Sequence, residues 1–475
     1  MSSALDRFPV EVMCCIFDQL SGPERRPLHL VCHGWYRMLT TKHYLLGRRL
    51  RLNPENVELF EMNGEDVRKF PCVRVRDDES SPRSVNRRNF LSLLRRVVFG
   101  KNVLENVQEL TLEGVQSDLL AELFGGCLVR FPNLKVLVLN CFEFDALHDV
   151  RKWNLSTSLT SLEISVSKQE EIQLIEAVAE QLTVLCIETI RLNLLLKCCD
   201  VGNFNKLRTL KLKSDTFFPE RFSSPNDISD NFKKTLAQIT TLSIVFRHND
   251  FLLGYAPLLH YCTKLESLSI FGADLCVAAC NVIRQLSCLK KLELLVRIEK
   301  DDYLLPWNLP NLANLHTYVE NLAPLGEDSP ALATIRISNH TIREGRFSNR
   351  PVERFYLNRY FSHFESILKL FLYDVYLEED LLLQFPKMKV REIILRCVRT
   401  SSLILDIIYE RAPAIFYLRF WDCCFLVSPR AKIPSFEALG RLLPHVRISH
   451  SSSKIIATSS STAALDHDLP TILLS

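Results

Sequence analysis

A short pattern of aliphatic residues recurs from Val107 onward and restricts the possible folds more than any other feature of the chain. Each copy has an aliphatic residue, two variable residues, a second aliphatic, one variable residue and a third aliphatic. A single copy cannot bury its apolar face alone, so stacked copies are predicted to share one core. Most copies follow one another after 20 to 28 residues, and the fifteen copies begin at Val107, Leu134, Leu159, Leu182, Leu207, Ile239, Leu265, Leu289, Leu312, Leu332, Val352, Ile367, Val390, Ile415 and Leu443.

Within each copy the second and third aliphatic residues are two positions apart, which is the spacing of one buried face of a strand. Less regular or helical residues follow before the next copy. If consecutive copies stack on one another, residues 107–450 are predicted to form an α/β repeat solenoid, with a parallel sheet inside and helices or irregular segments outside. The pattern resembles that of leucine-rich repeats, most closely at Leu134-x-x-Leu137-x-Leu139-Asn140-Cys141 and Val390-x-x-Ile393-x-Leu395-Arg396-Cys397.

Two steps in the array are irregular. The step from Val352 to Ile367 has only 15 residues, so one of those two copies is predicted to be false. The step after Leu207 has 32 residues and contains Phe217-Phe218-Pro219 and a Ser-Pro-Asn-rich stretch. Such residues favour a protruding loop that interrupts the array without ending it.

The remaining segments divide the chain further. Residues 1–45 form a separate helical head, and 46–106 are predicted to be a linker and N-terminal cap, with an early irregular strand at Phe70, Val73 and Val75. Residues 451–475 turn to Ser and Thr with little periodicity, which predicts a mostly disordered tail. The 475 residues would ordinarily predict about three domains, but a core that grows along one dimension overrides that expectation.

The charge and hydropathy of the chain exclude several classes of partner. A net charge of +3 is too mild to indicate a nucleic acid or a membrane as partner, and the arginines between 48 and 96 are interpreted as a solvated face. The first twenty residues lack the features of a secretory signal, and no apolar run approaches about 18 residues. The expected location is therefore the cytoplasm, the nucleus or both.

Sixteen cysteines occur as adjacent pairs or scattered singles. Cys276 and Cys280 are one helical turn apart and Cys288 follows, but no histidine or second couple completes a four-ligand zinc set. Buried free thiols are favoured over disulfides or a metal site. No metal and no cofactor is expected.

Within the head, the segment from Leu5 to Thr40 carries apolar residues at helical spacing in two short stretches separated by Ser21-Gly22-Pro23. A segment of this size has a thin core and leaves apolar surface for another helical protein. Its residues resemble the F-box pattern, with Phe8, Val12 and Pro27 as departures, at Leu5, Phe8, Pro9, Glu11, Val12, Ile16, Phe17, Leu20, Val31, Cys32 and Trp35.

This resemblance implies a small all-α F-box that docks on the Skp-type adaptor of a cullin-RING ubiquitin ligase, and through it on cullin and RING subunits. In this mode apolar anchors supply the affinity. The resemblance assigns adaptor binding to Leu5, Phe8, Pro9, Val12, Ile16, Phe17, Leu20, Val31, Cys32 and Trp35. An amphipathic helix pair that merely packs on itself is the alternative interpretation.

Strand alternation sorts the repeat residues between core and concave face. Early copies place small polar and acidic residues on that face, whereas later copies place residue types that dominate protein-binding hot spots. A protein substrate is predicted to bind Tyr318, Arg336, Arg354, Tyr356, Phe371, Tyr373, Arg396, Tyr417, Arg419 and Trp421. Packing of these aromatics on one another across neighbouring strands is an equally weighted interpretation.

No Gly-rich phosphate loop, nucleophile elbow or His-Glu-x-x-His motif occurs, so the chain is expected to have no catalytic residues of its own. The predicted function is substrate recognition in an SCF-type ligase, where proximity promotes transfer of ubiquitin. Two alternatives stay open. One is a ligand-sensing F-box receptor whose arginines suit an anionic ligand, and the other is an interaction scaffold outside any ligase.

Overall fold

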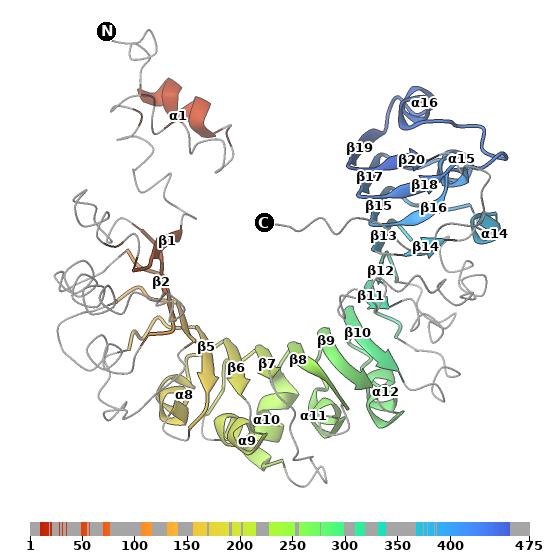
Figure 1. The fold of residues 1–475 in the computed structure, drawn as a ribbon. Coiled ribbons are helices and arrows are strands. Elements are labelled where there is room, and N and C mark those ends of the chain that lie inside the picture. Colours follow the sequence, from red (N-terminus) through yellow and green to blue (C-terminus); the bar gives the residue numbers. More distant parts are fainter. Residues whose placement is uncertain are drawn as a thin grey trace, which may run out of the picture. The chain divides into compact units, whose positions relative to one another are not determined.

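Close contacts divide the chain into two compact units. Unit 1 comprises Met1–Phe218 and Ile228–Thr235, and unit 2 comprises Pro219–Asp227 and Leu236–Ser475. The computed structural model (Figure 1) describes residues 10–18, 20, 28, 31, 35, 49–54, 57, 70–76, 106–115, 131–140, 155–168, 171–189, 192–200, 203–214, 228–251, 256–275, 277–298, 309–318, 331–338, 367–373, 375–377, 379–383, 385 and 387–456.

In unit 1, the helix α1 (Val10–Asp18) precedes a parallel sheet whose strands pair in chain order from β1 to β7. Helices α8 (Ile172–Val178) and α9 (Leu192–Asp200) connect β5 to β6 and β6 to β7. The strands are β1 (Arg49–Leu52), β2 (Cys72–Arg76), β3 (Glu109–Glu113), β4 (Val136–Asn140), β5 (Ser161–Val166), β6 (Val184–Thr189) and β7 (Thr209–Ser214).

Unit 2 continues the same pattern, and its main strands also pair in parallel and in chain order. These strands are β8 (Thr241–Phe251), β9 (Ser267–Leu275), β10 (Lys291–Ile298), β11 (Asn314–Tyr318), β12 (Thr334–Ser338), β13 (Lys369–Tyr373), β15 (Glu392–Arg396), β17 (Tyr417–Trp421) and β19 (Arg447–Ser451).

Helices of unit 2 lie in several of the return segments between these strands. Figure 1 shows α11 and α12 on one side of β8, β9 and β10, and among the described residues no helix covers the opposite face of these strands, which we call the helix-free face. The helices are α11 (Ala256–Tyr261), α12 (Val277–Arg284), α14 (Glu379–Leu382), α15 (Leu403–Arg411) and α16 (Phe436–Leu442), and α10 (Asp230–Gln238) crosses the division between the units and leads into β8.

Burial along the strands follows the aliphatic pattern of the sequence. Leu137 and Leu139 of β4 are buried, and so are Leu292 and Leu294 of β10. The first aliphatic residue of a copy closes a tight turn before its strand, as where Leu134 N–H donates to Phe131 O at 3.2 Å. Fully burying one leucine side chain stabilises a fold by about 1.5 to 3 kcal/mol. Each unit is therefore built as a leucine-rich repeat solenoid, as the sequence predicts.

A second parallel sheet, which the sequence did not predict, runs beside the last repeats of unit 2. Its strands are β14 (Tyr376–Leu377), β16 (Arg399–Ser401), β18 (Cys424–Leu426) and β20 (Lys454–Ile456). In three of these copies two residues separate the long strand from its short partner, and the first of the two has a positive φ: Cys397 at 53°, Asp422 at 51° and Ser452 at 54°. The chain thus turns at the same position in three successive copies.

Both sheets extend beyond the limits expected for the solenoid. β2 confirms the early strand expected around Val73 and Val75, and β1 pairs with it ahead of the first predicted copy. At the other end β20 reaches Ile456, beyond the predicted limit at 450. The Ser-rich segment from 457 onward lies outside the described residues, as does the predicted loop at 217–227.

The register of two late copies needs correction. β12 pairs directly with β13, so the copy at Val352 contributes no strand between them and Ile367 is the true start. The final copy is displaced from the predicted start at Leu443, because Ile448, and not Val446, pairs with Leu418, the second aliphatic residue of the preceding copy.

Every cysteine that the structure describes is a free thiol. Burial raises the pKa of Cys186, Cys198 and Cys262 to about 12. Cys280 is buried in α12 and Cys288 is exposed, whereas Cys276 lies outside the described residues. In the described part of the chain, no helix has the length and apolar character needed to span a membrane.

Candidate functional site

The head contains a small aromatic core. The rings of Phe17 and Trp35 meet edge to face, with their centroids 5.3 Å apart and an interplanar angle of 76°. Met13 is buried beside them, and Leu20 and Leu28 pack against the group while half-buried. Phe17 and Trp35 are thus core residues of the head, and Met13, one turn before Phe17, is a core residue that sequence reasoning missed.

Three predicted adaptor contacts lie on the surface of the head instead. Val12, Ile16 and Val31 are 40%, 43% and 49% exposed. Val12 and Ile16 are four residues apart on α1 and therefore share one face of the helix. We call Val12, Ile16 and Val31 the head patch. The other predicted contacts, Leu5, Phe8, Pro9 and Cys32, lie outside the described residues.

The helix-free face of unit 2 is ordered by strand register into rows of cross-strand neighbours. The middle row runs through Ser243, Ser269, Glu293, His316, Arg336, Phe371, Ile394, Arg419 and Ser449. A second row runs through Tyr318, Ser338, Tyr373, Arg396, Trp421 and Ser451. Side chains in one row are close enough to interact across strands.

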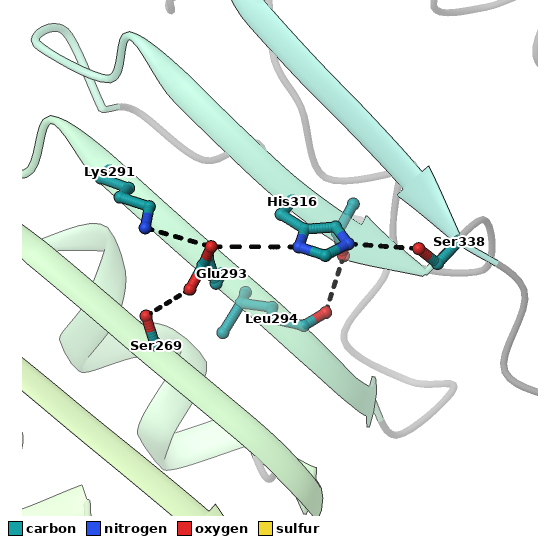
Figure 2. Close-up of polar contacts among 7 residues, drawn as sticks. Ser269, Lys291, Glu293, Leu294, His316 and Ser338 are labelled. Carbon is teal, nitrogen blue, oxygen red and sulfur yellow. Dashed lines mark hydrogen bonds and ion pairs between the residues drawn. The ribbon is translucent and has the colours of Figure 1, made fainter. Parts of the chain in front are cut away.

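The first half of this face carries a connected polar cluster, which Figure 2 shows. Ser269 Oγ donates to Glu293 Oε2 at 2.7 Å, and Lys291 Nζ lies 3.1 Å from Glu293 Oε1. His316 Nδ1 lies 4.0 Å from Glu293 Oε1, and His316 Nε2 is 3.1 Å from Ser338 Oγ. We call these five residues the polar cluster, whose carboxylate is surrounded by its own positive and hydrogen-bonding neighbours.

This arrangement moves two pKa values. Burial alone raises the pKa of Glu293, but the hydrogen bonds from Ser269 and Lys291 and the charge of Lys291 outweigh burial and leave the pKa lowered. Burial lowers the pKa of His316, and the charges of Arg336 and Lys291 lower it further, against the opposing effect of Glu293. The cluster therefore favours an ionised carboxylate beside a neutral imidazole.

The second half of the face is built from arginines on aromatic rings. Arg336 Cζ lies 4.9 Å from the Phe371 ring centroid. Arg396 Cζ and Arg419 Cζ lie 4.6 Å and 4.9 Å from the centroid of the Trp421 ring. The structure thus brings together most of the predicted substrate-binding residues; the arginine–aromatic surface consists of Arg336, Phe371, Tyr373, Arg396, Tyr417, Arg419 and Trp421.

The predicted residues differ in how far they reach solvent. Trp421 is 37% exposed, whereas Phe371 is only 7% and Tyr318 only 6% exposed. Tyr318 and Phe371 therefore offer little ring area to solvent, and Arg336 lies over the Phe371 ring; binding of a substrate by these two residues stays a prediction. Arg354 and Tyr356 lie outside the described residues.

Charge separates the two halves of the face. From β12 to β19 it carries one acidic side chain, Glu392, whose Oε2 lies 2.8 Å from Lys369 Nζ. Within the described residues, no carboxylate forms an ion pair with Arg336, Arg396 or Arg419. The Lys369–Glu392 pair was not foreseen, since only the strand register places these residues side by side.

The sequence matches no family model and no curated protein. Among solved structures, the chain is similar to the mouse RP105/MD-1 complex at 13% identity and a TM-score of 0.43, over 86% of this chain and 66% of that chain. It is also similar to an internalin from Listeria monocytogenes at 12% identity and a TM-score of 0.28, over 86% of this chain and 88% of that one. The chain thus spans about 66% of the RP105/MD-1 chain it matches, and its fold class rests on its own strand pairing.

Proposed function

We propose that this protein is the substrate-recognition subunit of an SCF-type cullin-RING ubiquitin ligase. In this proposal the head docks on a Skp-type adaptor and the helix-free face of unit 2 binds the protein to be ubiquitinated. The observation that carries the proposal is the head patch: three exposed apolar side chains around the Phe17–Trp35 core, in a segment with the F-box pattern.

The division between core and patch supports adaptor docking. Phe17 and Trp35 hold the head together, which leaves Val12, Ile16 and Val31 free to contact another protein. Clustered apolar side chains of this kind supply most of the affinity when helices dock on a protein groove.

The arginine–aromatic surface supports recognition of a protein substrate. Arginine, tyrosine and tryptophan dominate binding hot spots because they combine large area with directional polar groups. The protein itself supplies no catalytic group in this proposal. It raises the effective concentration of a substrate lysine near the ubiquitin-loaded enzyme that the RING subunit recruits.

Adaptor capture tests the head. The Val12→Ala/Ile16→Ala double variant is expected to lose the adaptor and cullin in a pull-down of the full chain, as are Phe8→Ala and Pro9→Ala. Leu442→Ala on α16 is a matched control, since Leu442 is equally exposed and apolar, and is expected to retain both partners. Normal capture by the double variant would contradict adaptor docking through the head patch.

Two alternative functions predict other results in the same experiment. A scaffold outside any ligase captures the adaptor without cullin or captures neither. A ligand-sensing receptor captures both but needs an anionic small molecule before it binds substrate, and the positive charges of Arg396 and Arg419 favour such a ligand.

Trp35→Ala is a poorer test of adaptor docking than the double variant. Losing a core aromatic destabilises a domain by about 3 to 5 kcal/mol, so the variant would lose the adaptor through unfolding of the head.

A further inference from the structure

The arginines of the arginine–aromatic surface are arranged as an anion site. The guanidinium groups of Arg396 and Arg419 both contact the indole ring of Trp421, so two positive charges lie next to one aromatic side chain. Charges of the same sign on one ring repel each other, and an anion that contacts these guanidinium groups reduces that repulsion. Among the described residues of strands β12 to β19, the one carboxylate is that of Glu392, and it is already paired with Lys369.

Stacking on a ring also orients the guanidinium groups. A guanidinium that lies over an aromatic face keeps its N–H edge available for a carboxylate or phosphate, which it binds through two parallel hydrogen bonds. The ring holds the side chain in place, as Phe371 does for Arg336. Arginines held over aromatic rings therefore lie at two places on the face, one at Arg336 and one at Arg396 and Arg419.

Strand register fixes the distance between these two sites. Arg336 and Arg419 occupy the same row and are three strand intervals apart. Three intervals correspond to roughly 14 Å, which an extended peptide covers in about four residues. Ile394 lies in the same row beside Arg419, so an apolar position is placed between the two sites.

We propose that the arginine–aromatic surface binds an extended acidic segment of a partner protein with the spacing acidic–x–apolar–x–acidic. Residues two and four positions apart in an extended segment point to the same side, so all three side chains face the surface. This proposal rests on the proposed function of the face as a partner-binding surface, and it requires neither the head nor the ligase.

Fluorescent peptides titrated with the full chain test the proposal. A peptide with Glu-x-Leu-x-Glu at its centre is expected to bind about ten-fold or more tightly than its Gln-x-Leu-x-Gln counterpart, because charge-assisted hydrogen bonds are lost with the carboxylates. A Glu-x-x-Glu peptide is the spacing control, since an odd interval turns one carboxylate away. It is expected to bind as weakly as the neutral peptide.

A phosphoserine version separates the two sources of the anion. Tighter binding than the glutamate peptide assigns the site to a phosphorylated segment, and equal binding assigns it to a segment acidic by composition; either result supports the proposal. Equal binding of the neutral peptide overturns it. Tighter binding of a single-stranded RNA oligonucleotide than of any acidic peptide overturns it as well.

Variants place the binding on this surface. Arg396→Ala/Arg419→Ala is expected to reduce affinity for the glutamate peptide about ten-fold or more. Arg396→Lys/Arg419→Lys keeps the charge but loses the fork geometry and is expected to fall between the alanine double variant and the unchanged chain. Arg391→Ala removes an exposed arginine one residue ahead of β15 and serves as the matched control with unchanged affinity.

The variants also have outcomes that contradict the proposal. Unchanged affinity in the alanine double variant overturns it, provided that circular dichroism shows a folded chain. The peptide titration contains no adaptor, so a negative result in the titration does not affect the interpretation of the adaptor pull-down. A failed pull-down with normal peptide binding removes only the ligase role.

Discussion

The polar cluster and the arginine–aromatic surface occupy the same sheet face of unit 2, on successive strands with the same alternation. In the polar cluster, the neighbours of each charge carry the opposite charge or a hydrogen-bonding group, as Lys291 and Ser269 do for Glu293. On the arginine–aromatic surface the neighbours of Arg396 and Arg419 include the Trp421 ring. The charges of the polar cluster are thus paired within the chain, whereas Arg396 and Arg419 lie on an aromatic ring.

The two regions also differ in the core residues beneath them. Truncating a core aromatic beneath the arginine–aromatic surface gives the largest expected loss of stability. Phe420 is fully buried beneath the arginine–aromatic surface, with the Phe425 and Phe436 ring centroids 5.4 Å and 5.0 Å away. Phe420→Ala is expected to lower the free energy of unfolding by about 3 to 5 kcal/mol. Urea denaturation followed by circular dichroism measures the change.

Thr317 occupies the equivalent core row beneath the polar cluster and provides the comparison. Its Oγ1 donates to Leu294 O at 3.1 Å in a buried position. Thr317→Ala is expected to lower the free energy of unfolding by about 1 kcal/mol. Equal losses at the two positions would show that the aromatic core gives the C-terminal repeats no extra stability.

The second prediction concerns a substitution that places a carboxylate on the arginine–aromatic surface, as Glu293 does in the polar cluster. Ile394 is half-buried in the middle row between Phe371 and Arg419. Ile394→Glu supplies the missing carboxylate and is expected to weaken binding of the glutamate peptide by about one hundred-fold, because it pairs with Arg419 and repels the peptide. Ile394→Gln separates charge from shape and is expected to weaken binding far less, as measured by fluorescence anisotropy.

The third prediction removes the carboxylate from the polar cluster. Glu293→Gln leaves Lys291 without its partner and is expected to lower the free energy of unfolding by about 1 kcal/mol. The charge of Glu293 raises the pKa of His316, so the variant is expected to lower that pKa further. Imidazole chemical shifts of selectively labelled histidine report the change; a higher pKa in the variant would contradict the described contact.

The fourth and smallest effect is the pH dependence of the polar cluster. His316 has a folded-state pKa below its ordinary value of 6.5, so folding favours the neutral imidazole. Its contribution to stability is complete above pH 6.5 and is lost as the pH falls from there through the folded-state pKa. Glu293, whose folded-state pKa is below 4.5, contributes in full above pH 4.5 and loses its contribution as the pH falls through the folded-state value.

His316→Gln separates these two steps. The variant is expected to lose the decline that begins below pH 6.5 and to retain the later one that begins below pH 4.5. Thermal unfolding measured over a pH series tests both. A decline of unchanged size below pH 6.5 in the variant would assign it to other histidines.

Much of the fold was predictable because its signal is local. The spacing of aliphatic residues such as Leu137 and Leu139 reports strand alternation within one copy, with no need to know the neighbouring copies. The second sheet has no comparable signal, since its strands are two or three residues long and Cys397, Asp422 and Ser452 turn the chain without glycine. Left-handed backbone at residues other than glycine cannot be read from composition.

The site was predictable only in part, for a different reason. Alternation placed Arg396, Arg419 and Trp421 on the correct face, but it did not reveal how deeply Tyr318 and Phe371 pack. Exposure depends on the neighbouring strands, and therefore on residues 20 or more positions away in the sequence. The polar cluster needed the same information, because register alone brings its members together.

The paired ladders of the last repeats have a consequence for the kinetics and entropy of association. Cys397 N–H donates to Trp421 O at 2.8 Å, and Asp422 N–H donates to Ser451 O at 2.9 Å, so the backbone is fixed immediately beyond Arg396 and Trp421. A surface held in this way is preorganised and loses little conformational entropy when a partner binds. Most of the conformational entropy lost on association is then lost by the acidic segment of the partner, because the backbone of the arginine–aromatic surface is already ordered before binding.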